Sequence, residues 1–194
     1  MTPASHPVVD PTSEVEAMLA SGTQLVTFDV FDTLLWRTTL FPHDVFLLLG
    51  KKPGQSIAAA RRFAEKVASV ICRKVLRREP ALSDVYRLLP FSMQQELALE
   101  ARVCVPNPFC LRLVNSLHRR KIPIAAISDM YLSSDQIARL LDGAGYPQLP
   151  VYSSASEHAT KFSHGQLFTK VWQRHRIAPS DVLHVGDTIH ADVA

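Results

Sequence analysis

Residues 24–35 read QLVTFDVFDTLL, and the fold predicted for this chain depends mainly on this stretch. It opens on QLVTF (24–28), a short and mainly apolar or β-branched run that is typical of a buried strand and stops at Asp29. Ligands of open parallel sheets bind beyond the carboxyl ends of the strands, so an aspartate at this point is a candidate site residue. On its own it is weak evidence, because aspartate also begins loops and caps helices.

Further strands are predicted in the second half of the chain. KIPIAAI (121–127) ends at Ser128 and DVLHVGD (181–187) ends at Asp187, so three predicted strands end in polar residues. Strands that alternate with helices of about ten residues indicate a parallel sheet flanked by helices, which is an α/β fold. The other elements predicted here are a helix over 109–119, a helix opened by Ser133-Ser134-Asp135-Gln136, a strand PVYSS (150–154) and a helix FTKVWQRHR (168–176).

The segment from about Leu40 to Val105 has a different pattern. Apolar residues recur there at steps of three and four and nothing alternates with period two, so we expect a helical insertion. Its predicted helices are HDVFLLL (43–49), 56–78, LSDVYRLL (82–89) and SMQQELALEARVC (92–104). The division that follows is an α/β core over 20–36 and 107–194, a helical cap over 37–106, and an N-terminal arm with a short helix over 1–19.

Composition excludes several classes of protein. With 194 residues, 47% of them hydrophobic and 20% charged, the chain has the size and balance of one globular domain rather than a disordered or fibrous chain. No apolar stretch approaches the roughly 18 residues of a membrane span, and the N-terminus lacks the basic start and apolar run of a secretory signal. Three cysteines without a CxxC pair predict buried thiols in a reducing cytoplasm rather than a disulfide framework.

The net charge of +3 is unevenly distributed. Residues 57–79 hold seven Lys or Arg against Glu65 and Glu79. A helix this basic suits phosphate-bearing partners, and it equally suits a solvated face. No nucleic-acid-binding motif accompanies it, so no nucleic-acid partner is predicted.

Four segments, taken in order, resemble the signature motifs of the haloacid dehalogenase-like (HAD) hydrolase superfamily. They are QLVTFDVFDTLL with Asp29, IPIAAISDMYL with Ser128, ATKFSHGQLF with Lys161, and VLHVGDTIHADV with Asp187 and Asp192. The resemblance covers about residues 20–194 and implies a three-layer, Rossmann-like core with a helical cap inserted after the first strand. More narrowly, FDVFDTLLWR, SDMYLSS and LHVGD resemble a branch of predicted hydrolases often found beside glycosyltransferase domains in surface-polysaccharide proteins.

The resemblance implies catalytic roles for the matched residues. Asp29 would be the nucleophile, with Thr33 as a supporting hydroxyl. Ser128 would donate a hydrogen bond to a phosphoryl oxygen, and Lys161 would offset the negative charge of nucleophile and substrate together.

The resemblance also implies a magnesium site. Mg²⁺ prefers oxygen ligands in an octahedron, usually one or two carboxylates with water and substrate phosphate. Here the ligands would be the side chains of Asp29 and Asp187 and the backbone carbonyl of Phe31. Asp192 would bind a metal water or hold those ligands.

Candidate substrate-binding residues lie beside the motifs. They are Ser128, Asp129, Lys161 and Arg37, of which Arg37 stands just past the first motif at the expected cap hinge. Arginine at such a hinge serves substrate binding or a surface salt bridge, and the sequence leaves both open.

Four other polar residues are ambiguous. The expected cap helix carries Arg61, Arg62 and Glu65. These residues either face the cleft or form surface ion pairs. His184 lies inside a predicted strand and is interpreted as a packed histidine rather than a metal ligand.

One position departs from the pattern of the resemblance. Phosphatases of the superfamily usually carry a second aspartate two positions after the nucleophile, as general acid and base, and here that position is Phe31. An aromatic residue there is closer to the haloacid dehalogenases, whose reaction needs no protonation of a leaving group. The next residue, Asp32, is therefore the candidate for proton transfer, which is typically worth ~10²–10⁴ in rate. The alternative is that Phe31 packs against the cap and Asp32 stabilises the turn.

The leading prediction is a Mg²⁺-dependent phosphatase that acts on a small phosphorylated metabolite or sugar phosphate through an aspartyl-phosphate intermediate. A metal-free, dehalogenase-like C–X hydrolase stays open, as does a weakly active HAD module that serves as a partner domain in polysaccharide synthesis. The chain ends two residues after Asp192, where the superfamily continues with a helix and a strand, so we expect a fragment of a longer protein.

Overall fold

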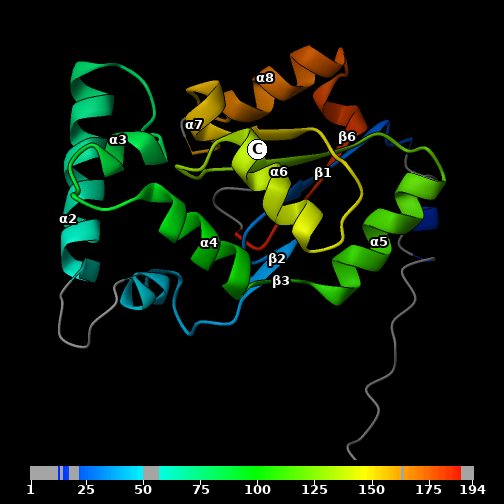
Figure 1. The fold of residues 1–194 in the computed structure, drawn as a ribbon. Coiled ribbons are helices and arrows are strands. Elements are labelled where there is room, and N and C mark those ends of the chain that lie inside the picture. Colours follow the sequence, from blue (N-terminus) through cyan, green and yellow to red (C-terminus); the bar gives the residue numbers. More distant parts are fainter. Residues whose placement is uncertain (1–12, 14, 18–21, 50–56, 163, 189–194) are drawn as a thin grey trace, which may run out of the picture.

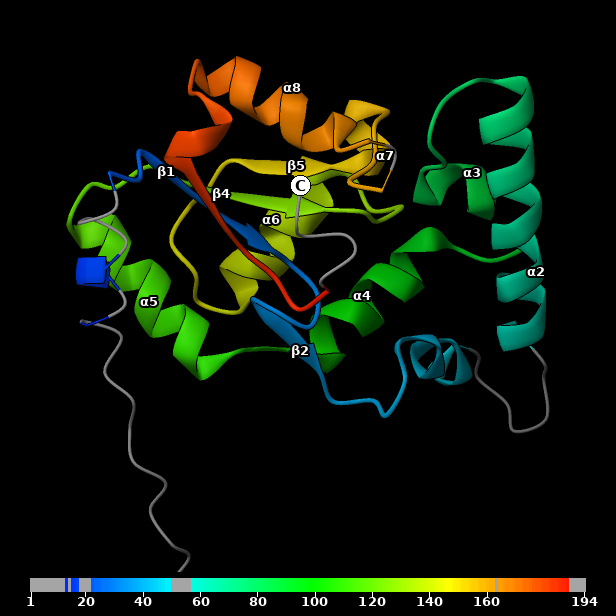
Figure 2. The same cartoon turned by 180° about the vertical axis from the view of Figure 1, so that it is seen from behind.

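Four parallel strands form the central sheet, in the order β5-β4-β1-β6 (Figures 1 and 2). Their bounds are Leu25–Asp29 for β1, Ile124–Ser128 for β4, Val151–Ser153 for β5 and Val182–Val185 for β6. In this register Asp29 stands opposite Ile127, and Phe28 stands opposite Val185. The computed structural model describes residues 13, 15–17, 22–49, 57–162 and 164–188.

Helices cover both faces of the sheet. Val26 and Phe28 of β1 belong to the core cluster of α5 (Pro108–Arg119) and α6 (Ser134–Gly143), whereas Leu25 belongs to the cluster of α8 (Gln166–His175). Alternate side chains of a strand point to opposite faces, so a strand buried on both faces needs apolar residues throughout. The predicted α/β fold with three layers is confirmed.

The element boundaries follow local chemistry. The strand predicted over 121–127 begins only at Ile124, because Lys121 takes a positive φ of 59° in the turn after α5. The predicted start of α6 is confirmed by a reciprocal cap. The Ser133 hydroxyl accepts a hydrogen bond from the Gln136 N–H at 3.2 Å, and the Gln136 side chain accepts one from the Ser133 N–H at 2.9 Å.

The described residues 38–49 and 57–103 belong to a helical insertion that leaves and re-enters the core through two antiparallel strands, β2 (Leu35–Arg37) and β3 (Cys104–Pro106). The sequence does not predict either strand, because three residues are too few to show a period of two. The elements of the insertion are the 3-10 helix η1 (Pro42–Leu48), α2 (Ile57–Val70), a π-helical segment (Ile71–Val75), α3 (Leu82–Tyr86) and α4 (Met93–Val103). The helix predicted over 56–78 is confirmed over α2 and continues to Val75 in π-helical geometry, so the prediction extends three residues too far, over 76–78. Two short elements complete the described fold, α7 (Ser154–Glu157) and η3 (Pro179–Asp181).

Two buried carboxylates on α4 tie the insertion together. Glu96 and Glu100 are one helical turn apart and have no exposed surface. Arg61 of α2 donates to both oxygens of Glu96, from Nε at 2.5 Å and from Nη2 at 2.7 Å, and Arg37 of β2 donates to Glu100 at 3.3 Å. Burial of a carboxylate is costly unless a charged donor accompanies it, so each pair specifies where α4 lies against its neighbour.

The predicted thiols are confirmed as free cysteines. Cys72 and Cys110 are buried and Cys104 is half-buried. Burial, reinforced by the neighbouring Glu100 carboxylate, raises the pKa of Cys104 to about 12, which keeps this thiol protonated. Within the described parts of the chain, no helix has both the length and the apolar character needed to cross a membrane.

Asn107 joins α5 to the first motif, and this supplies a test of the fold. Its Oδ1 accepts from the Phe109 N–H at 3.0 Å, and its Nδ2 donates to the Thr33 carbonyl at 2.9 Å. We expect Asn107→Ala to lower the free energy of unfolding by about 2 kcal/mol, and Asn107→Ser, which keeps a cap oxygen, by about 1 kcal/mol. Urea unfolding measures both, and equal losses in the two variants would show that the cap bond contributes nothing.

Candidate active site

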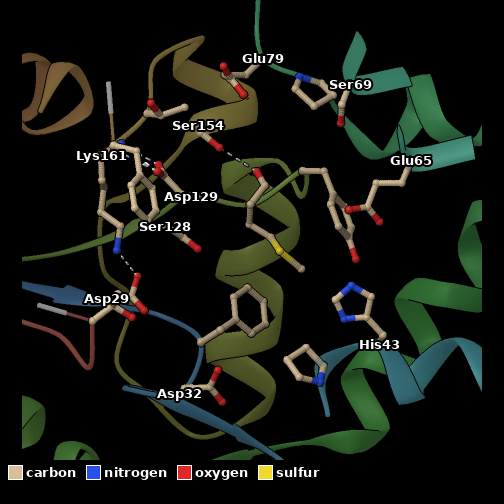
Figure 3. Close-up of a pocket in the computed structure, with 18 of the residues that line it drawn as sticks. Asp29, Asp32, His43, Glu65, Ser69, Glu79, Ser128, Asp129, Ser154 and Lys161 are labelled. Atoms are coloured by element: carbon tan, nitrogen blue, oxygen red, sulfur yellow. Dashed lines mark hydrogen bonds and ion pairs between the residues drawn. The ribbon is translucent and has the colours of Figure 1, made fainter. Parts of the chain in front are cut away.

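A cavity of about 700 Å³ opens at the carboxyl edge of the sheet, between the core and the helical insertion (Figure 3). The chain runs from β1 to β4 and β5 on one side and then crosses back to β6 on the other side of β1. Such a reversal leaves a crevice beyond the strand ends, where open parallel sheets bind ligands. The polar residues that line it from the core are Asp29, Asp32, Arg37, Ser128, Asp129, Ser154, Thr160, Lys161, Asp187 and Thr188.

A buried ion pair lies at the centre of this edge. The Lys161 ammonium donates to Oδ1 of Asp29 at 2.6 Å, and the two residues are only 7% and 8% exposed (Figure 3). Asp29 is the last residue of β1, so the sheet fixes its position. Lys161 comes from the loop between α7 and α8, where its carbonyl accepts from the Gly165 N–H at 3.1 Å. Within a cavity this pair combines a nucleophilic oxygen with a fixed positive charge.

Asp129 holds the loop that carries Lys161. Both of its carboxylate oxygens accept from the backbone N–H of Lys161, each at 2.9 Å, and the Phe162 N–H donates to it at 3.4 Å. Burial raises the pKa of Asp129, although these N–H groups and the Lys161 charge act in the opposite direction. These contacts give Asp129 a positioning role, and its predicted contact with substrate stays a prediction.

Ser128 is the last residue of β4 and is 2% exposed. It follows Ile127, the register partner of Asp29, so parallel pairing places it at the same edge of the sheet. Figure 3 shows it near Asp29 and Lys161. The structure thus brings three of the predicted catalytic residues to one cavity.

The turn after β1 presents Phe31 and Asp32 to the same cavity. The backbone N–H of Leu35 donates to the Val30 carbonyl at 2.8 Å, and the backbone N–H of Asp32 donates to the Leu35 carbonyl at 2.8 Å, which closes the turn. Asp32 has a φ of +63°, a left-handed conformation that costs energy for a residue with a Cβ and that aspartate tolerates better than most residues. Its side chain is exposed, so the carboxylate is accessible from the cavity.

Arg37 lines the cavity but is already engaged. Its guanidinium lies 4.2 Å above the centre of the Phe31 ring and donates to Glu100 at 3.3 Å. Phe31 therefore packs beneath an arginine at the base of the insertion. Substrate binding by Arg37 stays a prediction.

Three of the residues predicted to hold magnesium lie at the cavity, and their role as ligands stays a prediction. Asp29, Phe31 and Asp187 line the cavity, and the side chain of Asp187 is exposed. Two carboxylates and a backbone carbonyl fit Mg²⁺, which takes oxygen ligands and retains waters. Asp192 lies outside the described residues. Among the residues that the structure describes, no group of three or more His, Cys, Asp or Glu side chains is arranged to hold a metal ion.

His184 is a packed histidine, as predicted. Its Nδ1 is 2.8 Å from the Thr27 hydroxyl, and its ring meets the edge of Phe168 with centroids 4.8 Å apart. The Thr33 hydroxyl, expected to support the nucleophile, is buried without a hydrogen-bond partner among the described residues.

The insertion supplies site residues that sequence reasoning missed. His43, Ser69 and Glu79 line the cavity together with Glu65. Ser69 follows Glu65 by one helical turn on α2, and this spacing was the available signal. The cleft-facing interpretation of Arg61 is wrong, because Arg61 is fully buried behind the wall, and Arg62 is exposed and does not line the cavity.

Known structures share this arrangement of strands and helices. L-2-haloacid dehalogenase from Xanthobacter autotrophicus matches with a TM-score of 0.59 and 18% identity, over 84% of this chain and 69% of that one. A HAD-family enzyme from Bacteroides thetaiotaomicron, an aspartate-to-alanine variant in complex with magnesium and inorganic phosphate, matches with a TM-score of 0.56 and 16% identity, over 86% and 85%. A HAD phosphatase from Thermococcus onnurineus matches with a TM-score of 0.54 and 16% identity, over 88% and 80%.

The chain has the haloacid dehalogenase-like fold. No family model matches the sequence, and no curated protein matches it significantly. At these identities the structural likeness establishes the fold and not the chemistry.

The role of Asp129 can be tested without any substrate. We expect Asp129→Ala to speed amide hydrogen exchange at Lys161 and Phe162 by about tenfold or more, because those N–H groups lose a buried acceptor. Hydrogen exchange followed by mass spectrometry measures the effect. Asp135→Ala, at an exposed aspartate on α6, is the control. Unchanged exchange at residues 161 and 162 would contradict the positioning role.

Proposed function

We propose that this chain is a Mg²⁺-dependent phosphatase that hydrolyses a small phosphate ester through an aspartyl-phosphate intermediate. The observation that carries the proposal is the buried ion pair between Asp29 and Lys161 at the carboxyl edge of the sheet. A carboxylate and a phosphate repel each other, and a lysine ammonium against both reduces that repulsion. The cavity, of about 700 Å³, has the size of a small-molecule site.

In the proposed reaction the core residues act one after another. A carboxylate oxygen of Asp29 forms a bond to phosphorus while the bond from phosphorus to the ester oxygen breaks. Ser128 donates a hydrogen bond to a phosphoryl oxygen. Asp32 gives a proton to the departing ester oxygen and then takes one from the water that attacks phosphorus, which frees Asp29 and releases phosphate.

Magnesium fits the oxygen donors of the site and, when bound, neutralises charge on the phosphoryl group. The residues proposed to hold it are Asp29, Asp187 and the Phe31 carbonyl, with Asp192 in support. The structure of the HAD-family enzyme from Bacteroides thetaiotaomicron contains magnesium and phosphate, which supports this assignment by analogy. A cytoplasmic location, which rests on the three unpaired cysteines, belongs to the same proposal. So does an association with a glycosyltransferase, which rests on the motif resemblance.

A specific observation favours a second candidate. Phe31 stands where phosphatases of this fold usually place an aspartate, and dehalogenases with the same fold are among the structural matches. A metal-free hydrolase of C–X bonds would use Asp29 as the nucleophile without a proton carrier. Dependence on magnesium separates the two candidates.

The nucleophile can be tested by a matched pair of variants. We expect Asp29→Asn to lower phosphate release by about a thousandfold, or ~4 kcal/mol in barrier, because an amide keeps the size but cannot attack phosphorus. Asp135→Asn, outside the cavity, should leave the rate within about twofold. Phosphate release from a panel of phosphate esters measures both. Turnover by Asp29→Asn within tenfold of the wild type would place the chemistry elsewhere.

The metal assignment has its own readout. Asp187→Asn should raise the Kd for Mg²⁺ by about tenfold or more and leave thermal unfolding nearly unchanged, because an exposed carboxylate at the cavity is lost rather than a core group. Titration calorimetry with Mg²⁺ alone measures the affinity. Equal Mg²⁺ affinity in wild type and variant would contradict the site. Hydrolysis of a C–X substrate at an unchanged rate in the presence of a chelator would favour the second candidate.

A further inference from the structure

One arginine supports the wall of the cavity that faces the ion pair of Asp29 and Lys161. Arg61 of α2 is fully buried, and besides its two bonds to Glu96 it donates from Nη1 to Oε2 of Glu65 at 2.8 Å. Burial lowers the pKa of Arg61, but the Glu96 bond and the surrounding negative charges raise it overall, so this cation keeps its charge. Tyr86 belongs to the same cluster, because its hydroxyl donates to Glu96 at 2.7 Å.

Aromatic rings hold the same guanidinium from other elements. Its central carbon is 4.5 Å from the ring centre of Phe46 on η1 and 4.8 Å from that of Tyr131, which follows β4. A buried cation over ring faces is attracted to them electrostatically. The Leu82 N–H also donates to the Tyr131 carbonyl at 2.7 Å. One cation thus joins three elements whose side chains Phe46, Glu65 and Tyr131 all line the cavity.

Glu65 is the charged member of this cluster that reaches the cavity. Neither Arg61 nor Glu96 lines it, whereas the Glu65 side chain is 33% exposed and is a lining residue. Arg61 engages Oε2, and no residue that the structure describes donates a hydrogen bond to Oε1. Figure 3 shows Glu65, with Ser69 and His43, on the side of the cavity away from Asp29 and Lys161. A carboxylate oxygen there can accept a hydrogen bond from a ligand.

We propose that Glu65 determines substrate selectivity and that Arg61 is the positioning residue that holds it. Resting on the proposed function, the inference assigns the substrate to phosphate esters with hydroxyl or ammonium donors on the part remote from phosphorus. Those donors bind the Glu65 carboxylate while the phosphoryl group meets Asp29. A site built to accept a hydrogen bond discriminates against analogues without the donor, because a bound analogue covers the part-exposed Glu65 carboxylate and leaves its oxygen unpaired.

The test compares three esters as probes. Glucose 6-phosphate offers hydroxyl donors, ethanolamine phosphate offers an ammonium group, and phenyl phosphate offers neither. Glu65→Gln should lower kcat/KM about tenfold to a hundredfold on at least one donor-bearing ester, the loss typical of a hydrogen bond to a charged group, and leave phenyl phosphate within about twofold. Glu16→Gln is the matched control, because Glu16 also pairs with an arginine, Arg120 at 2.6 Å, outside the cavity.

Arg61→Lys tests the positioning role. A lysine keeps the charge but lacks the planar fork, so this variant should reproduce the selectivity change of Glu65→Gln, and the double variant should lose nothing further. Thermal unfolding checks that the variant is folded. If it is not, Glu96→Gln, which alters the support of Arg61 from behind the wall, takes its place. An equal loss on all three esters from either variant would assign Arg61 a structural role only.

Each remaining outcome is decisive. Equal losses on all three esters in Glu65→Gln, or no loss on either donor-bearing ester, would overturn the selectivity assignment while the proposed function stands. If the wild type hydrolysed phenyl phosphate but neither donor-bearing ester, the selectivity assignment would likewise be overturned. Absence of phosphate release from every ester tried would overturn the proposed function, and this inference with it.

Discussion

The ion pair between Asp29 and Lys161 is the interaction on which the arrangement of the site depends. Removing both charges from water is costly, and their attraction offsets that cost only where geometry and further hydrogen bonds are favourable. The fold supplies those conditions from residues distant in sequence. β1, between two parallel neighbours, fixes Asp29, and Asp129 at the end of β4 holds the backbone of the loop that brings in Lys161. The crossing of the chain from β5 to β6 keeps this edge of the sheet open to a ligand.

The helical insertion repeats the same physical solution away from the sheet. Successive turns of α4 bury Glu96 and Glu100, and each carboxylate takes an arginine from a different segment. Losing one partner of a buried pair typically costs 3–5 kcal/mol, since the other charge is left uncompensated. The pairs therefore specify how α2 and β2 pack on α4. Because Glu65 lies on α2, this packing also positions the wall of the cavity opposite Asp29.

The sequence predicts the elements whose signal is local. Apolar runs of about five residues mark β1, β4 and β6, and a serine followed three residues later by glutamine marks α6, so these agree with the structure. β2 and β3 are too short to carry a period, and their pairing joins residues far apart in sequence. Arg61 shares a helix face with the buried Ala64 and Ala68, yet nothing local identifies Glu96, 35 residues away, as its partner. Ordered motifs predicted Asp29, Ser128 and Lys161 at one cavity, whereas the insertion wall required the tertiary structure.

In the proposed reaction, Asp29 accepts the phosphoryl group. The most direct measurement is rapid acid quench of the enzyme during turnover of a phosphate ester, followed by peptide mass mapping. We expect the added mass of one phosphoryl group on the peptide that contains Asp29, and no such peptide from Asp29→Asn. A phosphoryl group on a different residue would contradict this role. So would an unmodified Asp29 peptide, provided that the enzyme is saturated with substrate and that hydrolysis of the intermediate limits the rate.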